Sequence, residues 1–376
     1  MAVFADGQRP FPRPIDPFAH SWDRSHRMPL VCRLLDTSGE AAWDAFVATH
    51  PHGTFFHRAA WRHVIERAFG HRTHYLMAER DGAIVGVLPI GHVRSALFGS
   101  TLISVPFGVY GGPLAVEPEA FAALAEAGAA LLPQTRASAL EFRFLSLPPE
   151  GWLDPAQWVT RGDLYVTFRK AIAADDEANM KAIPRKQRAV VRKGIERGLT
   201  SVADRDVAGL HRIYAESVRN LGTPVFSRRY FSLLAEVFAE DLDIVTVRDG
   251  ETPVASVMNF YWRDEVVPYY GGGTAAARAC HGNDFMYWDV MRRAAARGCR
   301  LFDYGRSKVG TGSFAFKKNW GFEPAPLHHC FRLAPGATVP EVNPLNPKYR
   351  LFIAAWKRLP LPLANLIGPH IVRGVG

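Results

Sequence analysis

Basic side chains gather in two short stretches of this sequence, and their spacing suits the binding of an anionic group. The first stretch, residues 181–197, reads KAIPRKQRAVVRKGIER and holds seven Lys or Arg residues against one acid. Within it, Arg185, Arg188 and Arg192 fall on one face of a helix, at spacings of three and four. Such a face can donate charge-assisted hydrogen bonds to phosphate oxygens. The alternative is a solvated helix face that pairs with acids elsewhere in the chain.

The second stretch surrounds Asp303 in the segment FDYGRSKVGTGSFAFKKNWGF. Asp303 ends an expected strand, where ligands gather in α/β sheets, so its carboxylate could accept or orient the proton of an amine. Backbone amides and the lysines of this segment, Lys317 among them, could hold a phosphate or an oxyanion. Further cations there are Arg306, Lys308 and Lys318. The glycines predict a mobile loop of close approach, and their spacing differs from the GxxxxGK[ST] phosphate loop. An ordinary glycine-rich connection is the alternative.

Two tyrosines precede three glycines in the segment YYGGG, and their hydroxyls could place a carbonyl group by hydrogen bonding. They are Tyr269 and Tyr270, at the end of an expected strand. Packing in the core is the alternative for both tyrosines, and capping a helix or pairing with an arginine is the alternative for Asp303.

The elements that must position these residues follow the same order in both halves of the chain. Each half has two helices, an Arg-Asp-Gly hairpin, a Tyr-Gly-Gly, a long helix, and a strand with an acid and an arginine. The expected helices are 40–49, 58–69, 117–132, 206–220, 228–238 and 284–297, the last capped by Asn283. The expected strands are 73–79, 83–90, 102–105, 139–145, 243–247, 254–262, 265–270 and 301–304.

Matched spacings support a duplication. Tyr110 lies 31 residues before Glu141, and Tyr270 lies 33 residues before Asp303. The sequence therefore predicts an α/β fold with mixed sheets, built as two tandem units whose boundary falls near 166–174. Chance similarity between two unrelated α/β domains is the alternative.

Composition narrows the class of protein. The chain has 376 residues, 48% of them hydrophobic and 22% charged, which is ordinary for globular domains and excludes disordered and collagen-like chains. The formal net charge of +9 indicates an anionic partner. Four cysteines without a CxxC pair, and histidines without an HExxH spacing, predict neither a disulfide framework nor a metal site. We expect a cytoplasmic chain from a reducing compartment.

The two ends of the chain differ in character from the rest. Residues 1–28 hold four prolines and no apolar run, so we expect a disordered or non-native extension, with Met1 or Met28 as the true start. Residues 336–376 form a tail that mixes aromatic, basic and apolar residues, with no run of 18 apolar residues. Such a tail suits the interface of an anionic membrane, and packing across the domain is the alternative.

The order of these motifs resembles the FemAB family of aminoacyltransferases and related proteins with two GNAT folds in tandem. The sequence is similar to the branch of this family associated with the PEP-CTERM/exosortase system. It rests on the segments GTFFHRAAW, VYGGPL, NMKAIPRKQRAVVRKGI, YAESVRNLGTPVFSRRYF, FDYGRSK and NPLNPKYRLF, which span most of the chain after Pro51. The resemblance implies a first GNAT-like domain at 29–170 and a second at 171–335, with the active cleft in the second or between the two.

The resemblance also implies a reaction and its participants. Family members move an amino acid from aminoacyl-tRNA to an amine, and related GNAT enzymes use acyl-coenzyme A. Here the amine would belong to a cell-envelope or exopolysaccharide precursor. This implies attack of an amine on an activated acyl group, for which we expect Lys317, Asp303 and Tyr270 to be the catalytic residues. The family pattern gives a transition-state role to Lys317 and phosphate contacts to the row Arg185, Arg188 and Arg192. Further substrate-binding residues are then Tyr269, Arg306, Lys308 and Arg219. We expect a monomer without a bound cofactor.

Departures from the family pattern keep other functions open. The first acid after Gly112–Pro113 is Glu117, later than in many family members. The acetyltransferase pyrophosphate loop Q/RxxGxG/A is also absent. The alternatives are a coenzyme A-dependent N-acyltransferase with the same residues, and a non-catalytic module that binds RNA or lipid phosphates on the same fold.

Overall fold

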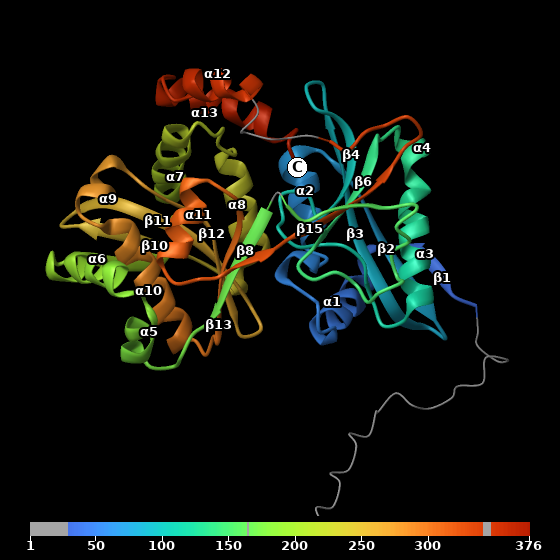
Figure 1. Cartoon of the computed structure of the whole chain (residues 1–376), viewed down its shortest axis with the longest axis horizontal. Helices are drawn as coiled ribbons and strands as arrows, with labels where there is room; N and C mark the ends of the chain where they lie inside the picture. Colours follow the sequence, from blue (N-terminus) through green and yellow to red (C-terminus); the bar gives the residue numbers. More distant parts are fainter. Residues whose placement is uncertain (1–28, 164, 341–346) are drawn as a thin grey trace, which may run out of the picture.

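Two mixed β-sheets lie side by side in the computed structural model of the chain, each with helices packed on it (Figure 1). The structure describes residues 29–163, 165–340 and 347–376. The predicted extension at 1–28 lies outside these residues. The mixed α/β class with two repeated units is confirmed by this arrangement.

The first sheet has the strand order β1-β2-β3-β4-β6-β15-β7, and β5 pairs with β3 at its side. Its strands are β1 (Val31–Leu34), β2 (Arg72–Arg80), β3 (Ala83–Ser95), β4 (Gly99–Ser104), β5 (Leu114–Ala115), β6 (Ala139–Phe144), β7 (Val159–Arg161) and β15 (His328–Leu333). Its helices are α1 (Glu40–Thr49), α2 (Trp61–Phe69), α3 (Pro118–Ala129) and α4 (Leu131–Thr135). The predicted helix at 40–49 coincides with α1, whose Trp43 and Val47 are buried.

The second sheet has the strand order β14-β8-β13-β12-β11-β10-β9. Its strands are β8 (Tyr165–Ala171), β9 (Thr200–Asp204), β10 (Leu242–Asp249), β11 (Thr252–Trp262), β12 (Glu265–Gly273), β13 (Leu301–Lys308) and β14 (Pro324–Pro326). Its helices are α5 (Asp176–Ala182), α6 (Arg185–Glu196), α7 (Val207–Leu221), α8 (Arg228–Val237), α9 (Ala275–Ala279), α10 (Gly282–Ala296) and α11 (Gly312–Asn319). Two more helices follow, α12 (Pro347–Trp356) and α13 (Leu361–Val372), beside α7 at one end of the second unit (Figure 1).

Each sheet contains one parallel pair of strands that separates after two residues of pairing. In the first sheet the pairs between β4 and β6 are Leu102 with Leu140 and Ile103 with Glu141. In the second sheet β12 and β13 pair only at Glu265 with Leu301 and at Val266 with Phe302. Both strands of each pair continue beyond this point, so each sheet opens there. The two openings carry the Tyr-Gly-Gly and acid–arginine landmarks of the sequence.

The strands are not divided between the sheets at the predicted boundary. Residues 170 and 171 both belong to β8, and all of β8 lies in the second sheet. The chain then returns, because β15, inside the predicted second domain, inserts between β6 and β7 of the first sheet. Alternating patterns in the sequence predict a strand but not which sheet it joins, and the two units are therefore interlocked by exchange of strands.

An aromatic layer joins the two units. Phe55 of the first unit stacks on Phe260 of β11, with ring centroids 4.5 Å apart, and Phe69 of α2 lies 5.0 Å from Tyr230 of α8. Trp61 and Phe238 contact across the same boundary. These side chains belong to one continuous buried cluster. Since a cluster of this kind is a core rather than a hinge, the two units should unfold together.

Two local predictions were wrong. Helix α10 begins at Gly282, and its N-cap residue is His281 in the left-handed region (φ 61°), not Asn283. The glycine-rich segment after β13 was predicted to be a mobile loop, but it forms α11, where the Thr311 hydroxyl accepts a hydrogen bond from the backbone N–H of Phe314. A threonine N-cap of this kind can start a helix in spite of nearby glycines.

We predict that Phe260→Ala destabilises both units together. The ring is fully buried in the aromatic layer, so its removal should lower the free energy of unfolding by about 3–5 kcal/mol. Denaturant unfolding should show one transition by circular dichroism and by tryptophan fluorescence. The matched control is Phe352→Ala on α12, where 39% of the residue is exposed and the loss should be far smaller. Separate transitions for the two units in the variant would contradict a shared core.

Candidate functional site

Asp303 lies on β13 where the second sheet opens, and no part of it is exposed. Its carboxylate accepts hydrogen bonds from the Tyr110 hydroxyl at 2.8 and 3.0 Å, from Arg169 Nε at 3.0 Å and from the Gly305 backbone N–H at 2.6 Å. Thr167 also donates to it, at 3.4 Å. Tyr110 belongs to the first unit and the other donors to the second, so the carboxylate ties the two units together.

A second carboxylate shares the arginine that binds Asp303. Arg169 also forms an ion pair with Glu265, at the start of β12. Burial, together with the nearby Asp303 charge, raises the pKa of Glu265. Burial also raises the pKa of Tyr110 far above its usual value, so its hydroxyl stays protonated and donates. This saturated network favours a positioning role for Asp303 over direct contact with a substrate.

Lys317 lies on α11, and its ammonium group turns inward to the backbone of β13. Its Nζ donates to the carbonyl oxygens of Tyr304 at 2.6 Å, Gly305 at 3.1 Å and Arg306 at 3.1 Å. Burial lowers the pKa of Lys317 to about 7, although the nearby Asp303 charge acts in the opposite direction. The charge of this lysine can therefore change near neutral pH.

A bulge in β13 turns the carbonyl groups of residues 304–306 toward Lys317. The register of β13 with β8 shifts between Asp303 and Arg306, and Gly305 adopts φ 64°. This left-handed conformation favours glycine, because a side chain would crowd the backbone. The Asp303 carboxylate holds the Gly305 N–H, which leaves the neighbouring carbonyls directed at Lys317. The fold brings Asp303 and Lys317 to the same few backbone groups.

The predicted tyrosines lie at the contact between the two sheets. The Tyr270 hydroxyl shares a hydrogen bond of 2.7 Å with Tyr230 inside the aromatic layer, and burial raises its pKa well above the usual value. The Tyr269 hydroxyl donates to the carbonyl of Phe107 at 2.7 Å, and burial raises its pKa to about 12. Both contacts favour packing and alignment of the units over contact with a reacting carbonyl.

The two predicted basic groups lie apart. The Arg306 guanidinium lies over the ring of Tyr165, 4.6 Å from its centroid, and Lys308 Nζ lies 5.9 Å from the same ring. At the other end of β8, Lys170 donates to the carbonyl of Ala182, next to the start of α6. The structure therefore places α6 and the Arg306–Lys308 pair at opposite ends of one strand.

Within the basic helix α6 the three arginines differ. Arg185 and Arg192 are exposed. Arg188 turns back and donates to the carbonyls of Lys181 and Ile183, so it closes the preceding turn. Arg219, on α7, donates to the carbonyl of Lys357 at 3.1 Å and so holds the C-terminal helices. Arg185 and Arg192 are the members of the set that remain accessible to an anion.

The opening of the first sheet carries a second buried network. Glu141 accepts hydrogen bonds from Arg143 at 2.9 Å and contacts His329 Nδ1 of β15 at 2.7 Å. Burial alone would raise the pKa of Glu141, but Arg143 and His329 lower it well below its usual range. Glu141, Arg143 and Tyr110 were predicted only as landmarks of the repeat, with no role in a site. His329, Arg169 and Glu265 were not predicted to belong to a site.

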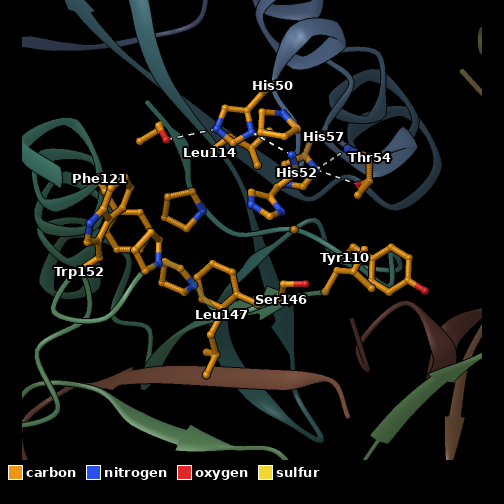
Figure 2. A pocket seen from close by; sticks show the side chains of 18 of the residues that line it. His50, His52, Thr54, His57, Tyr110, Leu114, Phe121, Ser146, Leu147 and Trp152 are labelled. Atoms are coloured by element: carbon orange, nitrogen blue, oxygen red, sulfur yellow. Dashed lines mark hydrogen bonds between the residues drawn. The ribbon is translucent and has the colours of Figure 1, made fainter. Parts of the chain in front are cut away.

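A pocket of about 360 Å³ also lies at the opening of the first sheet (Figure 2). It is walled by apolar side chains and by three histidines, His50, His52 and His57. Across the described ranges, 29–163, 165–340 and 347–376, no group of three or more His, Cys, Asp or Glu residues is placed to hold a metal ion. Nor does any helix in those ranges combine the length and apolar character needed to cross a membrane.

Comparisons with known proteins bear on the fold. Residues 180–318 match the family model "Acetyltransferase (GNAT) domain", a stretch that includes α6, Asp303 and Lys317. The search of curated proteins finds no match. Among solved structures, FemX is 15% identical and has a TM-score of 0.64, covering 86% of this chain and 100% of its own.

Two further structures are similar at lower scores. The C-terminal domain of a putative lysylphosphatidylglycerol synthetase from Agrobacterium fabrum is 13% identical, with a TM-score of 0.54 over 79% of this chain and 92% of its own. A tandem GNAT protein from the clavulanic acid biosynthesis pathway is 13% identical, with a TM-score of 0.50, and the match covers 81% of this chain and 98% of its own. None of these matches bears on the predicted PEP-CTERM association. The chain therefore has a GNAT-like fold, similar to FemX and to tandem GNAT proteins, and its second unit matches an acetyltransferase domain.

Proposed function

We propose that this protein transfers an acyl or aminoacyl group to an amine at the opening of the second sheet. The observation that carries the proposal is Lys317, whose ammonium group is buried against the backbone bulge that follows Asp303. The match of the surrounding segment to an acetyltransferase domain supports the same reaction class. As in the resemblance to FemAB proteins, the acceptor would be an amine of a cell-envelope or exopolysaccharide precursor.

In this reaction the amine nitrogen attacks the carbonyl carbon of the activated acyl group. A C–N bond forms, the C–S or C–O bond to the donor breaks, and the amine proton is lost as the leaving thiolate or alkoxide gains one. Lys317, when charged, would stabilise the negative oxygen or the leaving group. To do so it would exchange one of its bonds to the carbonyls of residues 304–306 for a bond to the substrate. Asp303 would act as a positioning residue, because it holds the bulge in place.

Both candidate donors carry phosphates, and the exposed arginines of α6 would bind them. Acyl-coenzyme A is the donor that GNAT domains use, so we place it first and aminoacyl-tRNA second. Arg185 and Arg192 would contact donor phosphates, while Arg306 and Lys308, at the far end of β8, would contact an anionic group of the acceptor. The contacts of Tyr270, Arg188 and Arg219 favour structural roles for these three residues.

The reaction would take place at the cytoplasmic face of an anionic membrane, to which the C-terminal helices would bind. Residues 342–376 contain five Lys or Arg residues and no acid. Leu351 on α12 is 81% exposed, and Leu366 on α13 is 68% exposed. The basic pair Lys357 and Arg358, in the turn between these two helices, is also exposed. Apolar side chains beside cations suit the interface of a bilayer with anionic lipids.

We predict that Lys317→Ala abolishes transfer without unfolding the protein. Loss of an oxyanion donor should lower turnover by about 10²–10³-fold. Donor loss is followed with acyl-coenzyme A and, separately, with aminoacyl-tRNA, each with a simple amine acceptor. Since the charged lysine is the active form, the rate of the wild-type enzyme should fall as the pH rises through the Lys317 pKa of about 7.

The conservative variant Lys317→Arg separates charge from structure. Because the guanidinium stays charged, any remaining activity should lose the falling limb of the pH profile. Full turnover by folded Lys317→Ala would remove Lys317 from the mechanism. Failure of the wild-type protein to consume either donor would instead favour a non-catalytic binding module.

We predict that Arg185→Ala combined with Arg192→Ala weakens donor binding. Each lost cation should raise the donor KM by roughly two- to fivefold, and the effect should shrink as salt increases. The matched control is Arg197→Ala, at the end of the same helix, because Arg197 is already paired with Asp249 at 2.8 Å. An equal effect of the control variant, or no effect of salt, would speak against phosphate binding by α6.

We predict that Leu351→Asp combined with Leu366→Asp reduces membrane binding about tenfold or more, since two apolar side chains no longer enter the bilayer. Flotation with phosphatidylcholine vesicles, with and without phosphatidylglycerol, measures the bound fraction. Wild-type protein should float only with the anionic vesicles. Val202→Asp, an exposed valine on edge strand β9, should bind as wild type does. Wild-type protein that stays unbound on anionic vesicles would exclude this surface.

A further inference from the structure

The pocket of the first unit occupies the place where β4 and β6 separate (Figure 2). One wall is the chain after β4, from Tyr110 to Val116, and another runs from Phe144, the last residue of β6, to Trp152. The segment from His50 to His57 completes the lining. Its volume of about 360 Å³ lies in the usual range for ligand pockets. No residue given a catalytic or phosphate-binding role above lines this pocket, so its occupant has to be identified from the chemistry of the lining.

The buried wall of the pocket is poor in charged side chains. None of its lining residues is Lys, Arg, Asp or Glu. Burial lowers the pKa of His57 to about 3 and also lowers that of His50, so both rings are neutral at neutral pH. A phosphate or a carboxylate would therefore enter without a counter-charge, at a large cost in desolvation.

Three ring nitrogens that border the pocket are bonded to the protein itself, whereas His57 Nε2 is buried without a hydrogen-bond partner among the described residues. His50 Nδ1 accepts a hydrogen bond from the backbone N–H of His52, and its Nε2 donates to the carbonyl of Ala115 at 3.2 Å. His57 Nδ1 accepts from the backbone N–H of Thr54 at 3.2 Å. A nucleobase or a peptide, whose polar edges need partners, would find few of them here.

The remaining surface is apolar and reaches the mouth of the pocket. Phe121 and Trp152 pack edge to face, with centroids 5.4 Å apart, and Phe144 lies beside them. At the mouth, Leu147 is 44% exposed and Val116 is 62% exposed. Exposed apolar side chains that continue into an apolar cavity indicate a binding site for an apolar group.

We propose that this pocket binds an uncharged hydrocarbon chain, of the kind found in an aliphatic acyl group or a prenyl alcohol. The chain would lie against Phe121, Phe144 and Trp152 and enter between Leu147 and Val116. As part of a substrate, it rests on the proposed function, but its binding can be measured without any turnover. The acyl donor and a lipid-linked acceptor are the two sources of such a chain.

A bound chain would lie against the loop that reaches Asp303. Tyr110 lines the pocket, but its ring points away from the pocket (Figure 2). The hydroxyl of this ring donates a hydrogen bond to Asp303. In the same loop Val105 and Phe107 adopt φ 54° and 66°, which is unusual for residues other than glycine. Strained backbone of this kind is found at ligand sites, where binding can select one loop conformation. The chain site and the Lys317 centre are thus linked by one side chain.

The test is binding of the neutral fluorescent probe phenylnaphthylamine to the full chain, followed by displacement with n-decanol. Wild-type protein should bind the probe saturably and release it to n-decanol. Leu147→Asp places a charge at the mouth and should weaken probe binding at least tenfold. The matched control is Leu97→Asp, at a leucine 75% exposed in the turn between β3 and β4, which should bind as wild type does.

Two displacement arms identify the source of the chain. Release of the probe by decanoyl-coenzyme A but not by acetyl-coenzyme A assigns the pocket to the acyl donor. Release by farnesol but not by decanoyl-coenzyme A assigns it to a prenyl acceptor. Folded wild-type protein that binds no probe, or a Leu147→Asp variant that binds it with wild-type affinity, overturns the proposal. Failure of the proposed function alone would show in turnover and leave probe binding intact.

Discussion

A carboxylate without any exposed surface must be surrounded by donors, and Asp303 obtains them from three separate parts of the chain. Tyr110 comes from the first unit, Arg169 from β8, and the Gly305 N–H from β13 itself. Loss of any one donor would leave buried charge without compensation, which is far more costly than loss of a surface contact. The relative placement of the two units and the path of β13 therefore follow from the needs of one side chain.

The same constraint shapes the surroundings of Lys317. In a regular strand the backbone carbonyls accept hydrogen bonds from neighbouring strands. In β13 the carbonyls of residues 304–306 accept hydrogen bonds from Lys317 instead. The cation is thus held by dipoles rather than by a paired acid. Such an arrangement keeps its charge sensitive to the environment, because neutral carbonyls stabilise an ammonium less than a carboxylate does. Among the described residues of the first unit no lysine contacts Glu141, which instead pairs with Arg143 and contacts His329.

Sequence patterns predicted much of the fold and part of the site. Periodic apolar residues and Asp-Gly turns located α1, the hairpin of β2 and β3, and the repeated plan of the two units. They could not assign β15 to the first sheet, because alternation describes the faces of a strand and not its neighbours. Asp303 was predicted from its place at the end of a strand, and Lys317 from the family resemblance. Arg169 and Glu265 are brought to Asp303 only by pairing between strands, which the sequence pattern does not reveal. For Tyr270, the residue type alone does not distinguish a tyrosine of the core from a tyrosine of an active site.

The late arrival of β15 has a consequence for synthesis of the chain. When residues up to Arg161 have left the ribosome, β6 still lacks its neighbour, because His328–Leu333 are more than 160 residues away. Until then, one edge of the first sheet offers unpaired backbone groups next to Glu141 and Arg143, and such edges invite pairing with other chains. The first half of the protein should therefore depend on chaperones, or on rapid completion of the second half, more than an independent domain of its size.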